Sequence, residues 1–375
     1  MSSSLGNTLR VQLFGQSHSR GLGVVVDGLP AGENVDMELV NEFLQRRRGG
    51  QNSYSTKRAE ADVPEILSGL VGDKTCGAPL CAVFENGDTR GADYEELRAV
   101  PRPSHADYTA FVKHSGHNDV MGGGHFSGRL TLPLCFAGAV CRQLLERRGV
   151  TVDAHIQSIG DILDDHFNGL PVRRDFPTVN AEAGEKMIRA IEAAAAEGDS
   201  LGGVVECGVW GLPAGFGDPF FDNIESRLAY GLFAVPAVKG VEFGAGFGAA
   251  KMRGSRYNDP FYMDWGTVKT KTNNSGGILG GISNGMPLLF RAAFKPTPSI
   301  SLPQDSVNLV SGQAATLNVK GRHDPCIVPR AVPCVIATTA IVMLDIILGN
   351  VSTVAENRNL PRNSDTKPKE CNTTP

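Results

Sequence analysis

The sequence has no cysteine pairing pattern, although it has eight cysteines, at positions 76, 81, 135, 141, 207, 326, 334 and 371. They are scattered, none belongs to a CxxC pair, and most have apolar neighbours, as in LPLCFAGAV. Such cysteines are typical of buried, reduced thiols. A disulfide framework or a cysteine-based zinc site is therefore not indicated.

The chain also lacks an excess of positive charge and a long apolar run. Its formal net charge is -4 and its pI is about 6.1, so no global basic field would hold nucleic acid or an anionic membrane, and any anion site must be local. The longest uncharged apolar run, 335–344, ends at Asp345 and is too short to span a bilayer. The N-terminal MSSSLGNTLRV has no apolar signal region, so we expect a cytoplasmic protein with no membrane or nucleic-acid partner.

A chain of 375 residues with 41% apolar residues can bury a large core. We find no repeat and no linker, so we predict one α/β domain over residues 1–350. A polar stretch with almost no apolar residues follows it. That last stretch, residues 351–375, is expected to be a disordered tail.

Residue spacing predicts where the helices and strands lie. The expected strands are 9–14, 23–28, 65–71, 80–86, 204–210, 238–243 and 287–294. The expected helices are 36–48, 130–149, 181–196, 223–233 and 334–348, and the polar, glycine-rich segment 254–285 is expected to be a long functional loop.

Histidines and arginines gather in loops marked by glycine or proline. His18, His105, His125 and His323 lie in GQSHS, RPSHAD, GGGHFSGR and GRHDP, where imidazole suits acid-base work. Arginines in similar settings are those at 46–48, 102, 129, 322 and 330. A lone loop arginine or histidine usually faces solvent, but several together favour a pocket for a polyanion, because guanidinium groups grip carboxylates and phosphates.

Two glycine- or serine-rich stretches have phosphate-binding character. GGGHFSGR (122–129) precedes a helix and offers free backbone N–H groups, and FKPTPSIS offers Lys295 and several hydroxyls. Neither is a Walker A sequence, and no GxGxxG follows a strand. A metal site at His114, His117 and Asp119 is a weak alternative, because no second ligand pair has matching spacing.

Three stretches together resemble the signature regions of the chorismate synthase family: 14–32, 122–140 and 321–333. RRRGGQ, RPSHAD, GGILGGISNG and FKPTPSIS resemble further family segments in the same order, so the resemblance covers about residues 5–349. It implies a single-domain β-α-β sandwich that assembles into a homotetramer. The implied reaction is the anti 1,4-elimination of phosphate from 5-enolpyruvylshikimate-3-phosphate, which gives chorismate in the shikimate pathway and needs reduced FMN without net redox change.

The same resemblance implies roles for individual residues. His18 and His105 would be the acid-base histidines and Asp324 would help to remove the ring proton. The implied substrate-binding residues are Ser17, Arg47, Arg102, Arg129 and Arg322. The implied flavin contacts are His125, Phe126, Ser127, Ala237, Gly280, Lys295, Pro296, Thr297, Pro298, Ser299 and Arg322. No metal is implied, and with no NADP-type fingerprint visible we favour an enzyme that takes reduced FMN from elsewhere.

The chain departs from the common family pattern at several positions. Gln16 and Ser19 stand where many members have an acidic residue and a glycine, and His125, Ser53 and Pro236 replace two arginines and an asparagine. Two other classes of function remain open from the residues alone. One is a metal-dependent hydrolase that uses His114, His117 and Asp119, and the other is a non-catalytic anion or nucleic-acid binder that uses Arg46, Arg47 and Arg48.

Overall fold

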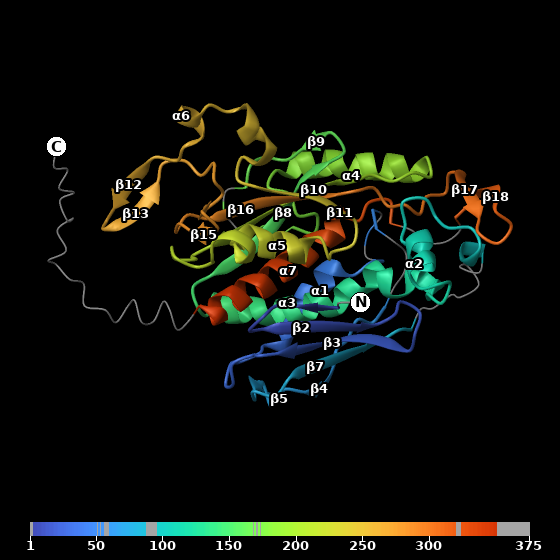
Figure 1. Cartoon of the computed structure of the whole chain (residues 1–375), viewed down its shortest axis with the longest axis horizontal. Helices are drawn as coiled ribbons and strands as arrows, with labels where there is room; N and C mark the ends of the chain where they lie inside the picture. The colour runs from blue at the N-terminus through green and yellow to red at the C-terminus, as the bar shows by residue number, and fades with distance from the viewer. Residues whose placement is uncertain are drawn as a thin grey trace, which may run out of the picture.

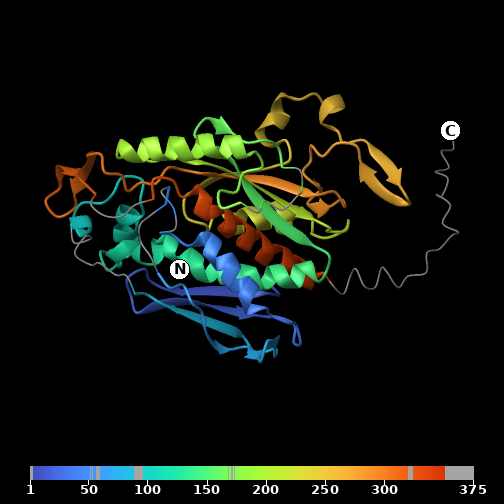
Figure 2. The same cartoon turned by 180° about the vertical axis from the view of Figure 1, so that it is seen from behind.

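Two antiparallel five-stranded sheets enclose a layer of helices (Figures 1 and 2). The computed structural model describes residues 3–50, 52, 54–55, 60–87, 96–167, 169, 172, 174–319 and 324–350. The predicted α/β class and the β-α-β sandwich are confirmed. Arg322, Ser53, His323 and residues 351–375 lie outside the described residues.

The first sheet has the order β1-β2-β3-β7-β4. Its strands are β1 (Ser4–Leu5), β2 (Arg10–Gly15), β3 (Gly21–Asp27), β7 (Leu80–Glu85) and β4 (Glu65–Ser68). Val11, Leu22, Val24 and Val26 point into the core, because alternate side chains of a strand share a face. β2 and β3 pair from Arg10 with Asp27 to Gly15 with Leu22, so the predicted hairpin that presents His18 is confirmed.

The second sheet has the order β11-β16-β10-β8-β9. Its strands are β11 (Val238–Phe243), β16 (Leu288–Phe294), β10 (Gly203–Trp210), β8 (Thr151–Ile159) and β9 (Ile162–Leu163). β16 runs antiparallel to β10 and ends at Phe294, so Lys295 and the following loop leave the sheet beside the start of β11.

Four helices fill the space between the sheets: α1 (Met37–Arg47), α3 (Thr131–Glu146), α5 (Ile224–Leu232) and α7 (Val328–Gly349). α3 and α7 pack closely because Gly138 meets Ala337, where an added Cβ would lie 2.2 Å from the Ala337 Cβ. Asp36 caps α1 by accepting from the Glu38 and Leu39 amides, as predicted. α4 (Ala181–Ala196) covers the outer face of the second sheet, and α2 (Asp107–Lys113) lies at one end of the molecule (Figure 1).

Several short elements complete the described chain. The strands are β5 (Leu70–Val71), β6 (Lys74–Thr75), β12 (Phe261–Asp264), β13 (Thr267–Thr270), β14 (Ile278–Leu279), β15 (Ile282–Ser283), β17 (Gln304–Asn308) and β18 (Gln313–Leu317). The short helices are α6 (Gly254–Tyr257) and the 3₁₀ turns Glu96–Arg98, Met121–Phe126, Gly128–Leu130, Phe220–Asp222 and Gly246–Lys251.

Three expectations about the elements differ from the structure. The last helix begins at Val328, before the predicted 334, because Pro329 lies in the first turn, where a helix needs no N–H donor, and Pro333 is tolerated inside. The segment 254–285, expected to be a loop, forms the hairpins β12–β13 and β14–β15. The central strand β8 and the hairpin β17–β18 were not predicted.

The last helix also fixes the start of the chain. The carboxylate of Asp345, 1% exposed, accepts hydrogen bonds from the backbone amides of Asn7, Thr8 and Leu9, each at 2.8 Å, and from Arg227. A buried carboxylate is tolerated when it is paired and hydrogen-bonded in this way. The N-terminal segment is therefore anchored to α7.

α7 is long and apolar enough to cross a membrane by length and composition, and its most apolar 18-residue window has a mean hydropathy of 2.3. In the structure, 94% of its most apolar window is buried by the surrounding elements. It is the central helix of the hydrophobic core.

Candidate active site

The turn between β2 and β3 holds His18 in place. The Ser19 hydroxyl lies 3.2 Å from the Gln16 amide and 2.9 Å from the Gly21 carbonyl oxygen. The side-chain amide of Asn86 donates to the carbonyls of Gln16 and Ser19, at 3.0 and 2.9 Å. Ser19, one of the departures from the family pattern, thus closes the turn that carries the histidine.

A glycine loop lies against this turn. Gly122, Gly123 and Gly124 have φ values of 59°, 81° and 54°, a left-handed conformation that side chains disfavour. The carbonyl of Gly124 accepts a 3.1 Å hydrogen bond from the Ser17 amide. A Cβ added to Gly122 would lie 2.0 Å from His18 Nδ1, so the absence of a side chain lets the imidazole pack directly on the loop.

The next glycine of the loop meets the second predicted histidine. A Cβ on Gly123 would lie 3.4 Å from His105 Cε1 and 3.5 Å from His105 Nε2. His18 and His105, 87 positions apart by their numbers, therefore pack on adjacent residues of one loop. Sequence analysis placed both in glycine- or proline-marked loops, and the structure brings those loops together.

His105 is held by a carboxylate that sequence analysis missed. Its Nδ1 lies 2.5 Å from Asp107 Oδ1, and the Asp107 side chain is 5% exposed. Arg102 donates to the same carboxylate through Nε at 2.7 Å, Nη2 at 2.9 Å and its backbone amide at 3.1 Å. Burial alone would raise the pKa of Asp107, but the hydrogen bonds from Arg102 and His105 outweigh it and lower that pKa well below its usual range.

The predicted flavin loop 295–299 packs on this cluster. Arg102 Nη1 donates to Ser299 Oγ at 3.1 Å, and Lys295 Nζ donates to the Ser104 carbonyl. Burial, with a contribution from the nearby Lys239, lowers the pKa of Lys295. Two of the predicted motifs, RPSHAD and FKPTPSIS, are thus in direct contact.

Two further predicted flavin residues border the same loop. The Lys295 amide donates to the Ala237 carbonyl at 3.0 Å, and Ala237 has a φ of 73°. The Thr297 hydroxyl is buried and has no hydrogen-bond partner among the described residues. A buried hydroxyl without a partner favours a site that a polar ligand completes.

Arg129 and Arg47 share the carboxylate of Asp62. Arg129 Nη1 donates to Asp62 Oδ1, and Arg47 Nη1 lies 3.5 Å from Asp62 Oδ2. All three side chains are at least 95% buried, and Asp62 has a left-handed φ of 53°. Arg129 Nε also donates to Asn86 Oδ1 at 3.2 Å, which connects the arginines to the His18 turn. Asp62 and Asn86 carry no motif, and sequence analysis missed both.

Arg330 connects Asp324 to this arginine pair. Arg330 Nη1 donates to Asp324 Oδ2 at 2.6 Å, and its Nε donates to the Arg47 carbonyl at 3.0 Å. Arg47 is fixed in turn by Thr131 Oγ1 at 2.8 Å and the Gly128 carbonyl at 3.1 Å. Burial and the nearby charge of Arg330 lower the pKa of Arg47.

The remaining predicted flavin residues fall in different places. His125 Nδ1 lies 2.8 Å from the Gly15 carbonyl and its Nε2 lies 3.0 Å from Ser3 Oγ, so its ring ties the glycine loop to the N-terminal segment. Ser127 Oγ accepts from the Arg129 amide at 3.3 Å, and Phe126 is 37% exposed.

Gly280, another predicted flavin residue, lies far from loop 295–299 within the chain. It forms the turn of the β14–β15 hairpin, and the Gly281 carbonyl of that turn accepts from Ile224 at the start of α5. β15 precedes β16, whose seven residues separate this end of the sheet from Lys295 by roughly 20 Å. Figure 1 shows β15 in the left half of the molecule and α2 in the right half.

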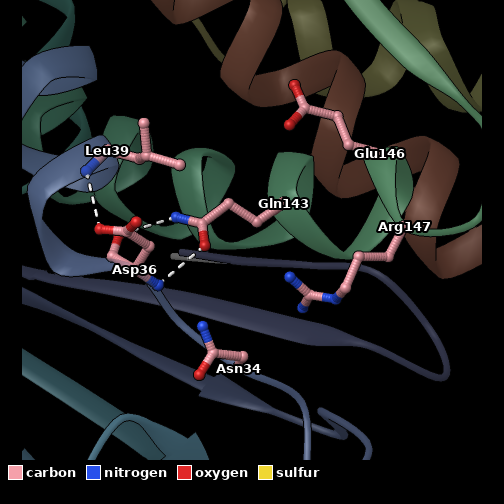
Figure 3. Close-up of a pocket in the computed structure, with 6 residues that line it drawn as sticks. All are labelled: Asn34, Asp36, Leu39, Gln143, Glu146 and Arg147. Carbon is pink, nitrogen blue, oxygen red and sulfur yellow. Dashed lines mark hydrogen bonds between the residues drawn. The ribbon is translucent and has the colours of Figure 1, made fainter.

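A surface cavity of about 380 Å³ lies away from the predicted residues (Figure 3). It is lined by Asn34, Asp36, Leu39, Gln143, Glu146 and Arg147. Gln143 both donates to the Asp36 carbonyl and accepts from the Asp36 amide, each at 2.9 Å. The cavity is at the C-terminal end of α3, roughly 20 Å along the helix from Thr131, and so belongs to a different part of the surface.

The alternative metal site at His114, His117 and Asp119 has no supporting cluster in the part of the chain that the structure describes. There, no group of three histidine, cysteine or acidic side chains is arranged to hold a metal ion. Asp119 accepts from the Met121 amide at 2.9 Å, and the His114 ring lies 6.5 Å from that of Phe126.

Comparison with known proteins agrees with the resemblance seen in the sequence. The model of the chorismate synthase family matches residues 9–348. The chain belongs to the chorismate synthase family. It is therefore an enzyme, and the family's reaction is the formation of chorismate in the shikimate pathway.

Relatives and a solved structure match almost the whole chain. Chorismate synthase from Dehalococcoides mccartyi is 46% identical over 353 residues, covering 93% of this chain and 97% of the relative. Chorismate synthase from Thermococcus kodakarensis is 47% identical over 345 residues, covering 92% and 97%. A crystal structure of a chorismate synthase superposes with a TM-score of 0.71 at 26% identity, covering 94% of this chain and 98% of that one.

Proposed function

We propose that the chain eliminates phosphate and a ring proton from 5-enolpyruvylshikimate-3-phosphate, using reduced FMN without net redox change. The observation that carries this proposal is the packing of His18 and His105 on adjacent residues of the glycine loop, beside Arg102 and Arg129. Two imidazoles next to several guanidinium groups suit a reaction that moves protons on a polyanionic substrate.

The arginines supply the charge that this substrate needs. It carries two carboxylates and a phosphate, and Arg47, Arg102 and Arg129, with Ser17, are the described groups that we assign to them. Arg102 commits Nε and Nη2 to Asp107 and one Nη1 hydrogen to Ser299, which leaves part of its fork for an anion. We assign the same role to Arg322, which lies outside the described residues.

The acid-base roles go to His18, His105 and Asp324. Each histidine would hold a proton at a ring nitrogen and deliver it, one to the flavin and one to the departing phosphate. Asp324 would help to take the ring proton, and Arg330, which donates to it at 2.6 Å, would hold this carboxylate in its orientation.

The residues around loop 295–299 fit a flavin. The buried Thr297 hydroxyl, which has no hydrogen-bond partner among the described residues, offers a polar group to a ligand. We assign flavin contacts to His125, Phe126, Ser127, Ala237, Gly280, Arg322 and the residues from Lys295 to Ser299. Reduced FMN would supply electron density to the breaking carbon–oxygen bond and recover it when the proton leaves.

We further propose a cytoplasmic homotetramer in which residues 1–350 form the catalytic domain. The distance between Gly280 and Lys295 within one chain supports an arrangement in which neighbouring copies complete the flavin site. We expect reduced FMN to come from another source, because no NADP-binding fingerprint is present; NADPH oxidation by the purified protein with FMN would contradict this expectation.

The deciding experiment measures phosphate release from 5-enolpyruvylshikimate-3-phosphate under anaerobic conditions. We expect release with chemically reduced FMN, none with oxidised FMN, and no effect of a chelator. Absence of release with reduced FMN would refute the proposed reaction, and activity that a chelator abolishes would favour the metal-dependent hydrolase.

A further inference from the structure

The carboxylate of Asp107 is built into the site but belongs to none of the roles assigned above. It lies two residues after His105, its side chain is 5% exposed, and its two oxygens receive four hydrogen bonds, from Arg102 and His105. A buried carboxylate this well satisfied is rigid, because moving it would break several bonds at once.

These contacts determine which nitrogen of His105 carries the proton. Arg102 lies 3.0 Å from His105 Nδ1, but a guanidinium can only donate, and both groups face the same ionised carboxylate. The arrangement that satisfies all three groups has Nδ1–H donating to Asp107 Oδ1, with Arg102 Nη2 donating to that same oxygen. Nε2 then carries the lone pair of the neutral ring, and it is the nitrogen on the side of Gly123.

We propose that Asp107 is a positioning residue that fixes His105 in the Nδ1–H tautomer, so that Nε2 exchanges the proton during catalysis. This inference rests on the proposed function of the same site. Asp107 itself does not touch the reacting atoms. It acts through His105, as a carboxylate behind a catalytic histidine does when it selects the tautomer and orientation of the ring.

Arg102 helps to hold Asp107 and His105 in this arrangement. It grips Asp107 through its backbone amide, Nε and Nη2, and it reaches Ser299 on loop 295–299 through Nη1. The orientation of His105 is thus coupled to the loop that we assign to the flavin.

The test compares Asp107→Asn with Asp345→Asn. Asp345 is an equally buried carboxylate that also accepts from an arginine and from backbone amides, but it lies fifteen positions beyond Arg330 on α7, roughly 22 Å along the helix. Its substitution controls for the loss of a buried charge outside the site. Both variants are assayed well below their unfolding temperatures.

The first readout is the tautomer of His105 in the free enzyme, from the nitrogen shifts of its ring, with His105→Gln used to assign the signals. We expect Nδ1–H in the wild type and in Asp345→Asn, and a shift towards Nε2–H in Asp107→Asn. The second readout is kcat at saturating substrate, which should fall about 10²- to 10⁴-fold in Asp107→Asn. It should change less than threefold in Asp345→Asn.

The inference is overturned if the wild-type ring carries its proton on Nε2, or if Asp107→Asn keeps both the tautomer and the wild-type kcat. The tautomer needs neither flavin nor substrate. A wild-type protein that shows the expected tautomer but releases no phosphate would therefore refute the proposed function and leave the role of Asp107 in ring orientation intact.

Discussion

Arg129 and Asp62 form an almost fully buried ion pair, although 67 residues separate them in the chain. Arg47 lies 3.5 Å from the other oxygen of the same carboxylate. Asp62 is therefore an internal counterion for two of the cations that we assign to the substrate, and Glu60 Oε2 lies 3.9 Å from Arg129 Nη2.

Replacing this carboxylate tests its role as an internal counterion. Asp62→Asn removes the negative partner that two buried guanidinium groups share and leaves only Glu60, 3.9 Å from Arg129 Nη2, so the free energy of unfolding should fall by about 3–5 kcal/mol. Inorganic phosphate should restore more stability to this variant than to the wild type, because it supplies the missing charge. Thermal unfolding with and without phosphate measures both effects.

The control for this prediction is Asp264→Asn, which breaks a partly exposed pair with Lys269. That change should cost at most about 1 kcal/mol and leave the phosphate effect unaltered. Equal phosphate-induced shifts in the wild type and Asp62→Asn would rule out the counterion role.

The two histidines should be needed for turnover and not for folding. His18→Ala and His105→Ala are each expected to lower kcat roughly 10- to 10,000-fold, because each removes a proton-transfer group. His117→Ala, at an exposed position, should retain wild-type turnover. If His117→Ala were inactive while both other variants kept their activity, the roles would have to move to the metal alternative.

Gly122 should tolerate no side chain. Gly122→Ala and Gly72→Ala both place alanine at a left-handed φ, 59° and 62°, so each should cost about 1–2 kcal/mol of stability. A Cβ at Gly72 meets nothing within 4 Å, whereas one at Gly122 overlaps His18. Steady-state kinetics should therefore show at least a tenfold loss of kcat in Gly122→Ala alone; equal kinetics in the two variants would show that His18 does not depend on this contact.

The lowered pKa of Asp107 predicts a pH-dependent contribution to stability. The folded protein holds this carboxylate ionised below its usual pKa, so the contribution is complete above the unfolded value of about 3.9 and decreases as the pH falls below it. The difference in unfolding free energy between the wild type and Asp107→Asn should thus shrink as the pH falls from about 5 to below about 4. Urea unfolding across this range measures it, and a difference that grew towards low pH would contradict the assignment.

Removal of residues 352–375 should leave turnover intact, because the described core ends with α7 at Gly349 and the sequence beyond it is almost free of apolar residues. Phosphate-release assays and circular dichroism on the truncated protein check this. A folded but inactive truncation would show that the segment contributes to the site.

The predictable parts of the structure are those that local sequence determines. The β-branched residues of β2 and β3 favour strands, and Asp36 is a preferred residue at the start of a helix, so these elements can be predicted from nearby residues alone. β8 was not predicted, although Val152, Ala154 and Ile156 alternate with polar residues. Its polar side chains, Asp153 and His155, are buried as well, and charged or polar residues are not expected in a buried central strand. There His155 lies between Asp164 and Glu206, at 2.9 and 3.1 Å.

The same limit applies to the site. His18 and His105 could be found because their loops carry recognisable residues around them. Asp62 could not, because its role depends on a left-handed backbone conformation and on two arginines, one from α1 and one from the 3₁₀ turn before α3, that only the tertiary structure brings to it. Asp107 stood inside the RPSHAD motif, but a sequence does not show which side chain a carboxylate faces.

The anchoring of Asn7, Thr8 and Leu9 by Asp345 has a consequence for synthesis on the ribosome. These contacts join residues at least 336 positions apart, so the segment between β1 and β2 can reach its final hydrogen bonding only after α7 has left the exit tunnel. Contacts of such high sequence separation slow folding, because a long loop must close before they form. The amides of Asn7, Thr8 and Leu9 therefore lack these final partners in the nascent chain until α7 has been synthesised.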